Sequence, residues 1–149
     1  FNEGRPLFVR TSDGKLTPAN FIKTQIYSAL ASLALGMEIL YDEGVKVDEM
    51  FGHGGFFKTP KVGQLAMSAA IKSPVTVMKN AGEGGPYGMA LLAAFTDAGC
   101  PLPEFLDGVF ADCEKLTLTA DERENAMFCS FLKRYKKGLA AEKAAAENL

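Results

Sequence analysis

Two glycine-rich loops, each between a short apolar segment and a helix-like segment, constrain the fold of this chain most strongly. The first loop is GHGGFFKTP, residues 52–60, and the second is GEGGPYG, residues 82–88. Glycine is used where a backbone turns sharply or approaches another group closely. A strand, a glycine loop and a helix, repeated in this order, predict an α/β domain with parallel strands and right-handed crossovers. Ligands of such folds bind at the carboxyl ends of strands, where both loops are expected.

The longest predicted helix precedes the first loop. Thr17 is a suitable cap, Pro18 suits the first helical position and Gly44 suits the stop. Its apolar residues recur at helical spacing, with further apolar residues between them, so we expect it to pack on more than one side. The residues concerned are Phe21, Ile22, Ile26, Leu30, Leu33, Met37 and Leu40.

Shorter elements are predicted on both sides of the loops. We expect strands at Leu7 to Arg10, near Glu49 to Phe51, and over PVTVM, residues 74–78. Thr59 followed by Pro60 predicts a second helix from about Pro60 to Lys72. A third helix follows the second loop, and its small residues Gly88, Ala90, Ala93 and Ala94 would allow it to pack closely on a neighbour.

The tail after residue 100 is predicted to be mostly helical. Thr119 with Glu122 matches the S/T-x-x-E capping box, which marks a helix start. Met127, Phe128, Phe131, Leu132 and Tyr135 give this helix an apolar face. The final Ala/Glu/Lys run has few large apolar residues, so we expect it to fray or project.

Composition excludes several classes of protein. Of the 149 residues, 48% are hydrophobic and 23% charged, which argues against disorder, and the net charge of -2 gives no signal for nucleic-acid binding. Three widely spaced cysteines and a single histidine, His53, predict neither a disulfide framework nor a metal site. No apolar run reads as a membrane span. We therefore expect a soluble cytoplasmic protein.

Two familiar phosphate-binding motifs do not fit the loops. A P-loop needs a Gly-Lys pair followed by Ser or Thr, but Gly14 and Lys15 are followed by Leu16. The dinucleotide pattern G-x-G-x-x-G would need glycine where Phe57 and Tyr87 stand.

The region from about Thr17 to Gly99 resembles the carboxy-terminal domain of the FGGY carbohydrate kinases. That family shows G-G-G-A-x-S-x-x-x-x-Q-x-x-A-D, then a proline-valine strand, then E-x-x-A-x-G-A-A-x-x-A. The spacing between these blocks also agrees with the family. The matching residues are Gly54, Gly55, Lys58, Thr59, Pro60, Gln64, Pro74, Val75, Glu83, Gly88, Ala90 and Ala93.

The resemblance implies an actin-like, ribonuclease H-like ATPase domain, with a sheet flanked by helices and a helical carboxy-terminal tail. It implies ATP, used with Mg²⁺ in the parent enzyme, and a sugar held by another domain. Carried over by position, the nucleotide-binding residues are Gly54, Gly55, Phe56 and Thr59. Backbone N–H groups at a helix start suit phosphate oxygens or a purine edge. Phe56 and Phe57 replace small residues of the family pattern, so the pocket wall is expected to differ here.

The resemblance places the other parts of the site before Phe1. Phosphoryl transfer needs a carboxylate base, magnesium and donors around the γ-phosphate. In the family the aspartate base, most of the sugar site and a Gly-Thr turn come earlier in the chain, and no residue here matches them, so no catalytic or metal residue is assigned. We therefore expect residues 1–149 to be one domain, most of the nucleotide-binding domain, without its sugar-binding partner and inactive alone. The spacing from Gly55 to Gln64 fits xylulokinase-like members better than ribulokinase-like ones, which favours a pentulose.

Other interpretations remain open. The paired glycines could form a strand-to-helix turn, and the chain could be a non-catalytic actin-like nucleotide-binding or assembly module. A homodimer through the face that its missing partner would cover is a third hypothesis. Gly84, Gly85 and Gly88 are expected to be packing glycines, and Glu83 to bond backbone N–H groups at its helix start. Lys58 is expected to be solvated or to reach a phosphate.

Overall fold

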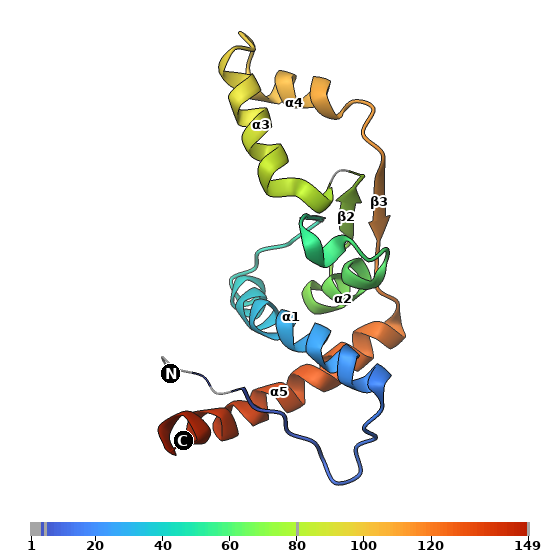
Figure 1. Cartoon of the computed structure of the whole chain (residues 1–149), viewed down its shortest axis with the longest axis vertical. Helices are drawn as coiled ribbons and strands as arrows, with labels where there is room; N and C mark the ends of the chain where they lie inside the picture. The colour runs from blue at the N-terminus through green and yellow to red at the C-terminus, as the bar shows by residue number, and fades with distance from the viewer. Residues whose placement is uncertain (1–3, 5, 80, 149) are drawn as a thin grey trace.

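The computed structural model of the chain describes residues 4, 6–79 and 81–148. Figure 1 shows a body of helices and a small sheet, from which two further helices extend. The α-helices are α1 (Pro18–Asp42), α2 (Val62–Ile71), α3 (Gly84–Thr96), α4 (Leu102–Phe110) and α5 (Glu122–Asn148). The strands are β1 (Met50–Gly52), β2 (Val75–Met78) and β3 (Lys115–Leu118), and the short 3-10 helices are η1 (Gly55–Phe57) and η2 (Ala81–Glu83).

The sheet of the described chain has three strands in the order β1-β2-β3. β1 and β2 are parallel, with Phe51 opposite Thr76, as the strand-loop-helix pattern predicts. β2 and β3 are antiparallel, with Thr76 opposite Thr117, and the hydroxyl oxygens of these two threonines lie 2.5 Å apart. The fold class is therefore mixed α/β, as expected.

The tail after residue 100 is mostly helical, as expected, and contains α4 and α5. It also contains a strand that was not predicted: residues 115–118 form β3, because their alternating leucines and threonines fit the free side of β2. The strand predicted at Leu7 to Arg10 is absent, and Leu7, Phe8 and Val9 are exposed. A strand needs a hydrogen-bonding neighbour, and no described strand lies beside this segment.

The core lies where α2 packs between α1, α5 and the sheet. All residues of α2 except Val62, Leu65 and Met67 are buried. Its alanines allow the neighbouring helices to come close, and larger side chains from α1 and α5 fill the remaining space. Tyr27 of α1 meets Phe128 of α5 edge to face, with ring centroids 5.0 Å apart.

Polar contacts at the edge of the core join the same elements. The Tyr27 hydroxyl donates to Glu124 at 3.0 Å, and Lys23 pairs with that carboxylate at 3.0 Å. Burial, followed by the hydrogen bond to Glu124, raises the pKa of the Tyr27 hydroxyl well above its usual value, so it stays a donor at neutral pH. Gln64 of α2 donates to the carbonyls of Val75 and Leu116, at 3.1 and 2.9 Å. This amide therefore ties α2 to both β2 and β3.

Helix α1 is only partly covered. It contacts both α2 and α5, as predicted, and Leu30 and Met37 are buried. Four other residues predicted for its buried surface are exposed, although the ring of Phe8 lies against that of Phe21, with centroids 5.5 Å apart. These are Phe21 (44%), Ile22 (58%), Leu33 (36%) and Leu40 (42%).

One of the three predicted helix starts is confirmed. The Thr17 hydroxyl accepts a hydrogen bond from the N–H of Asn20 at 3.2 Å, and Pro18 is the first residue of α1. The helix predicted from about Pro60 to Lys72 is present as α2, but it begins at Val62, and Thr59 and Pro60 belong to the preceding turn and do not start it.

The capping box at Thr119 was also misplaced. Asp121 caps α5 instead, and its carboxylate accepts from the N–H of Glu124 at 2.7 Å. Thr119 cannot cap the helix because the chain there is still leaving β3, and the next N–H, of Ala120, donates to the buried Ser68 hydroxyl at 2.9 Å.

Helices α3 and α4 form an arm that extends from the body (Figure 1). Tyr87 packs against Phe110, and Phe95 against Phe105, with centroids 6.3 and 5.4 Å apart. The predicted close packing of α3 was wrong: none of its described side chains is buried, and a Cβ at Gly88 would meet nothing within 4 Å. Aromatic residues, rather than the small ones, make its contacts.

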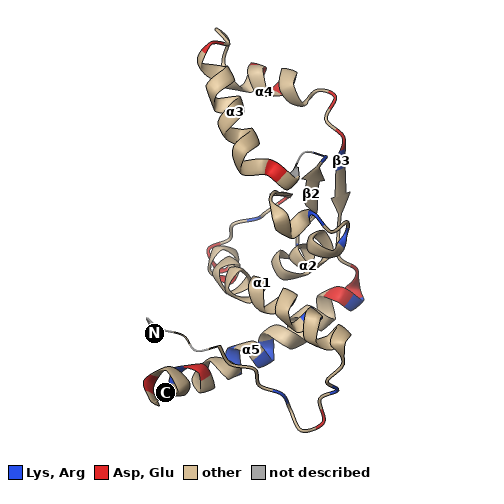
Figure 2. Ribbon diagram, viewed as in Figure 1, with Lys and Arg blue, Asp and Glu red and all other residues tan. Residues whose placement is uncertain are grey.

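The last helix projects and does not fray. Helix α5 continues to Asn148 and extends away from the body in Figure 1. Figure 2 shows basic residues along its middle section, where Lys133, Arg134, Lys136 and Lys137 are exposed as expected. Across residues 4, 6–79 and 81–148, none of the helices has the length and hydropathy needed to cross a membrane.

We predict that the core depends on Ile71, the last residue of α2, which is 0% exposed. Ile71→Ala should lower the free energy of unfolding by about 3 kcal/mol, because it removes buried methyl groups and leaves a cavity. Ile39→Ala is the matched control, since Ile39 is 66% exposed, and should change stability by less than about 0.5 kcal/mol. Urea unfolding followed by circular dichroism measures both, and equal losses would contradict this description of the core.

Candidate functional site

The two glycine loops meet at one end of the parallel strand pair. The first follows β1, the second follows β2, and η1 of the first contacts η2 of the second. Because β1 and β2 are parallel neighbours, their carboxyl ends lie at the same edge of the sheet. This is the edge at which α/β folds bind their ligands.

Three glycines shape the loops by admitting other groups of the same chain. A Cβ at Gly52 would lie 2.6 Å from the ring of Phe57, and one at Gly63 would lie 2.5 Å from the carbonyl oxygen of Phe56. A Cβ at Gly84 would lie 2.7 Å from the Cβ of His53. These distances are too short for any real side chain. The packing role predicted for Gly84 is therefore confirmed, whereas Gly85 and Gly88 face open space.

Gly54 and Gly55 are different, because the space that a Cβ would occupy at each of them is empty. A Cβ at either position would meet no heavy atom within 4 Å. Gly54 has φ +92°, a conformation that residues with side chains rarely adopt, and its carbonyl accepts from the N–H of Phe57 at 3.1 Å. The main chain is therefore bare at these two residues.

The two phenylalanines after these glycines have different positions. Phe57 covers Gly52 and packs against the core, while Phe56 is 37% exposed. Their rings meet edge to face, with centroids 5.3 Å apart. Phe57 thus anchors the loop to the core, whereas Phe56 and the exposed Thr59 remain at the surface.

No described side chain caps the start of α2, and the N–H of its first residue, Val62, donates to the Pro60 carbonyl at 2.9 Å. Val62 follows Lys61, which has φ +67°. Such a φ is strained for lysine. It follows from the sharp turn at residues 59–61, which directs the chain from η1 into α2.

An ion pair joins the two loops. The Lys58 ammonium donates to the Glu83 carboxylate at 2.8 Å, and both side chains are exposed. The hydrogen bond from Lys58, reinforced by its charge, lowers the pKa of Glu83. The prediction that Glu83 bonds the backbone of its own helix was wrong, because its carboxylate faces Lys58 and makes no capping bond.

A match to a family model accounts for this arrangement. Residues 2–96 match the model of the FGGY family of carbohydrate kinases, C-terminal domain. The chain belongs to the FGGY family. None of the curated proteins and none of the solved structures compared with this chain matches it.

The match to the FGGY domain covers both glycine loops and ends with α3. It therefore includes all four residues predicted to bind the nucleotide, whereas α4, β3 and α5 follow it. The three-stranded sheet with its helices is consistent with such a domain. The tail after the match still contributes to the fold, because Phe128 of α5 closes the core and β3 pairs with β2.

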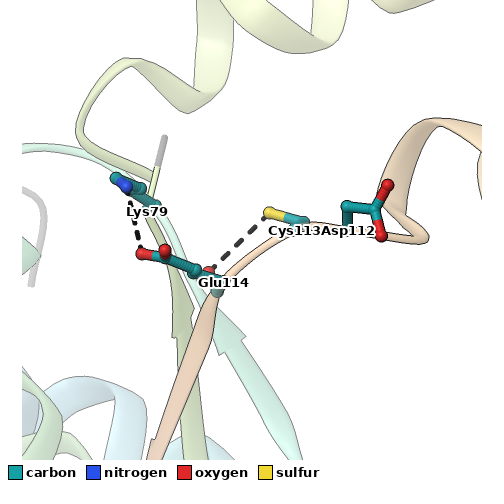
Figure 3. Close-up of a pocket in the computed structure, with 4 residues that line it drawn as sticks. All are labelled: Lys79, Asp112, Cys113 and Glu114. Atoms are coloured by element: carbon teal, nitrogen blue, oxygen red, sulfur yellow. Dashed lines mark hydrogen bonds and ion pairs between the residues drawn. The ribbon is translucent and has the colours of Figure 1, made fainter.

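Two cavities of this FGGY chain lie away from the glycine loops. A shallow one of about 280 Å³ is lined by Lys79, Asp112, Cys113 and Glu114, and Figure 3 shows the ion pair of Lys79 with Glu114, 3.0 Å long, on its side. A larger one, of about 460 Å³, lies between α1, α2 and α5, with Tyr41, Lys72 and Asn125 in its wall. Neither is lined by Gly54, Gly55, Phe56 or Thr59, of which Gly54 is partly exposed and the other three are exposed.

No cluster of three or more His, Cys, Asp or Glu side chains suited to a metal ion occurs in the described part of the chain. Magnesium at nucleotide sites is held largely by phosphate oxygens and water, with one or two carboxylates. The residues described here therefore do not form a metal site of their own.

Sequence reasoning missed the contact between the loops. Lys58 and Glu83 are 25 residues apart, and only the pairing of β1 with β2 brings them together. The available signal was that both follow parallel strands and have opposite charges. The inward position of Phe57 had no sequence signal, since Phe56 is the same residue type.

We predict that Gly63 is required for the shape of the first loop. Helix propensity alone would make Gly63→Ala stabilising by about 1 kcal/mol, but the overlap with the Phe56 carbonyl should make it destabilising by about 1–3 kcal/mol. Gly55→Ala is the control, since its Cβ enters open space, and should change stability by less than about 0.5 kcal/mol. Urea unfolding shows whether Gly63→Ala stabilises or destabilises the chain. A gain in stability would refute the close contact between Gly63 and the Phe56 carbonyl.

Proposed function

We propose that this chain is the ATP-binding part of a sugar kinase of the FGGY family. In this proposal, the parent enzyme transfers the γ-phosphate of ATP to a hydroxyl of a ketose or polyol, with Mg²⁺ bound to the nucleotide. Residues 1–149 then form most of one actin-like nucleotide-binding domain, and a separate domain holds the sugar. The membership of the FGGY family supports the reaction class.

The observation that carries the proposed site is the bare main chain at Gly54 and Gly55. Their backbone groups can approach a nucleotide without obstruction, because no heavy atom occupies the space that a Cβ would fill. Phe56 offers an exposed ring on which a purine can stack, and Thr59 offers a hydroxyl at the same surface. Phe57 leaves this space free because it packs inward against Gly52.

In this site, the chain's own residues bind and orient the nucleotide. The exposed main chain at Gly55 is suited to contact with anionic oxygens of the nucleotide, since a backbone N–H group is a strong hydrogen-bond donor. Mg²⁺ neutralises charge on the phosphates when it is bound with them. No described residue is placed to remove a proton from a sugar hydroxyl, so this step is assigned to the sugar-binding domain.

For the sugar, we propose a pentulose and a xylulokinase-like subtype. The support is the spacing from Gly55 to Gln64, which the structure explains in part: Gln64 is buried and bonds to the carbonyls of Val75 and Leu116. The length between the loop and this anchor fixes how far η1 reaches beyond the sheet. A cytoplasmic location is part of the same proposal.

A second candidate is a non-catalytic actin-like module in which the nucleotide switches a conformation or an assembly. The exposed apolar residues of α1 and α3 favour it, since Ile39 is 66% and Met89 67% exposed and both could bind another chain. Homodimerisation through such a face belongs to this alternative.

Nucleotide binding should depend on the open space at Gly55. Titration with ATP, followed by amide chemical shifts, should move the resonances of Gly54 and Gly55. Gly55→Leu should weaken ATP binding about tenfold or more, because the side chain fills the space beside the main chain. Gly88→Leu is the control, since Gly88 also faces open space but lies on α3, and it should bind ATP as the unchanged chain does. Equal affinity of the two variants would contradict the site.

The chain by itself should not phosphorylate a sugar. ADP release with xylulose, ribulose or glycerol should equal the rate without sugar, because the proposal assigns both the sugar site and the proton-accepting carboxylate to the separate sugar-binding domain. Addition of the sugar-binding domain of the parent enzyme should restore a sugar-dependent rate. Sugar-dependent turnover by the isolated chain would refute this part of the proposal, and nucleotide-dependent assembly without turnover in the complete protein would favour the second candidate.

A further inference from the structure

The ion pair of Lys58 with Glu83 lies beside the bare glycines but is not explained by their role. Lys58 follows η1 directly, three residues after Gly55, and Glu83 ends η2. The two side chains meet at 2.8 Å across the gap between the loops. Lys58 is thus the cation placed at the edge where the proposed nucleotide surface meets the second loop.

The stem of Lys58 is positioned as well as its charge. A Cβ at Gly82 would lie 3.2 Å from Cε and 3.5 Å from Cγ of Lys58, so the lysine stem lies over Gly82. The missing side chain of Gly82 gives the stem its place, and Glu83 then binds the ammonium. The second loop therefore holds the lysine at two points.

The ion pair between Lys58 and Glu83 is weak enough for another anion to replace Glu83. The Lys58 and Glu83 side chains are 57% and 73% exposed, and ion pairs as exposed as this contribute little to stability. A phosphate offers more charge and more acceptor oxygens than a carboxylate, and lysine is a common partner for it. Replacing Glu83 by a phosphate oxygen is therefore favourable for Lys58.

We propose that Lys58 contacts the phosphates of the bound nucleotide, and that Glu83 holds the lysine until the nucleotide replaces it. This inference rests on the proposed nucleotide site and adds a side chain to its backbone contacts. It also gives Glu83 a role, because a carboxylate near the phosphates would otherwise repel them. Before binding, that carboxylate keeps the lysine extended over Gly82.

Calorimetric titration of the 149-residue chain with ATP and with adenosine tests the proposal, because adenosine has the base and ribose but no phosphate. Lys58→Met should weaken ATP binding about tenfold and leave adenosine binding unchanged within about twofold. Lys58→Arg keeps the charge and should bind ATP nearly as the unchanged chain does. Glu83→Gln should strengthen ATP binding about threefold, since it removes the competitor and the repulsion.

The ion pair of Lys79 with Glu114 provides matched controls. It is similarly exposed and has a length of 3.0 Å, but it joins the residue after β2 to the residue before β3 and contains no residue of the first loop. Lys79→Met and Glu114→Gln should leave both affinities unchanged. If they shift ATP binding as much as the Lys58 and Glu83 variants do, general electrostatics explains the effect and the proposal fails.

The remaining outcomes separate this inference from the proposed function. If ATP and adenosine bind but Lys58→Met weakens neither, the nucleotide site stands and the role of Lys58 is refuted. If Glu83→Gln weakens ATP binding, Glu83 supports Lys58 and does not compete for it, which refutes the exchange. If the unchanged chain binds neither ligand, the nucleotide site itself fails and the inference fails with it.

Discussion

The burial of α2 between α1, α5 and β2 is the constraint on which the rest of the structure depends. The small residues of α2 permit this close packing, and its buried Gln64 binds carbonyls of two strands. Because α2 packs on α1 and α5 and is hydrogen-bonded to the sheet through Gln64, the position of its first turn relative to the sheet is fixed. The loop from β1 must then reach that turn within nine residues, 53–61, which forces the sharp bends at Gly54 and Lys61.

The glycines of the first loop divide into two groups with different physical roles. Gly52 and Gly63 are sites of internal contact, since Phe57 and the Phe56 carbonyl occupy the space beside them. Gly54 and Gly55 are open on the surface. The structural interpretation of the motif therefore applies to Gly52 and Gly63, whereas the proposed nucleotide contact concerns Gly54 and Gly55.

Much of this fold was predictable from local sequence, because some short patterns are compatible with only one kind of secondary structure. Thr17 with Pro18 located the start of α1, and the β-branched alternation located β2. The predictions failed where the same short sequence is compatible with two local structures. Thr119 lies three residues before Glu122 and Asp121 lies three residues before Glu124, so both fit the capping pattern, and the extended chain leaving β3 decides for Asp121. β3 itself depends on an antiparallel partner about 40 residues earlier.

The sequence by itself determined the family, the order of the helices and strands from α1 to α3, and the position of both glycine loops, because these follow from local spacing along the chain. Only the tertiary structure decided which glycines are open, which phenylalanine faces inward, and that Lys58 meets Glu83. Those outcomes depend on how α2 and the β1-β2 pair hold distant segments against each other. The amino-acid sequence contains the residues that make such contacts, but the packing of the folded chain sets the distances between them.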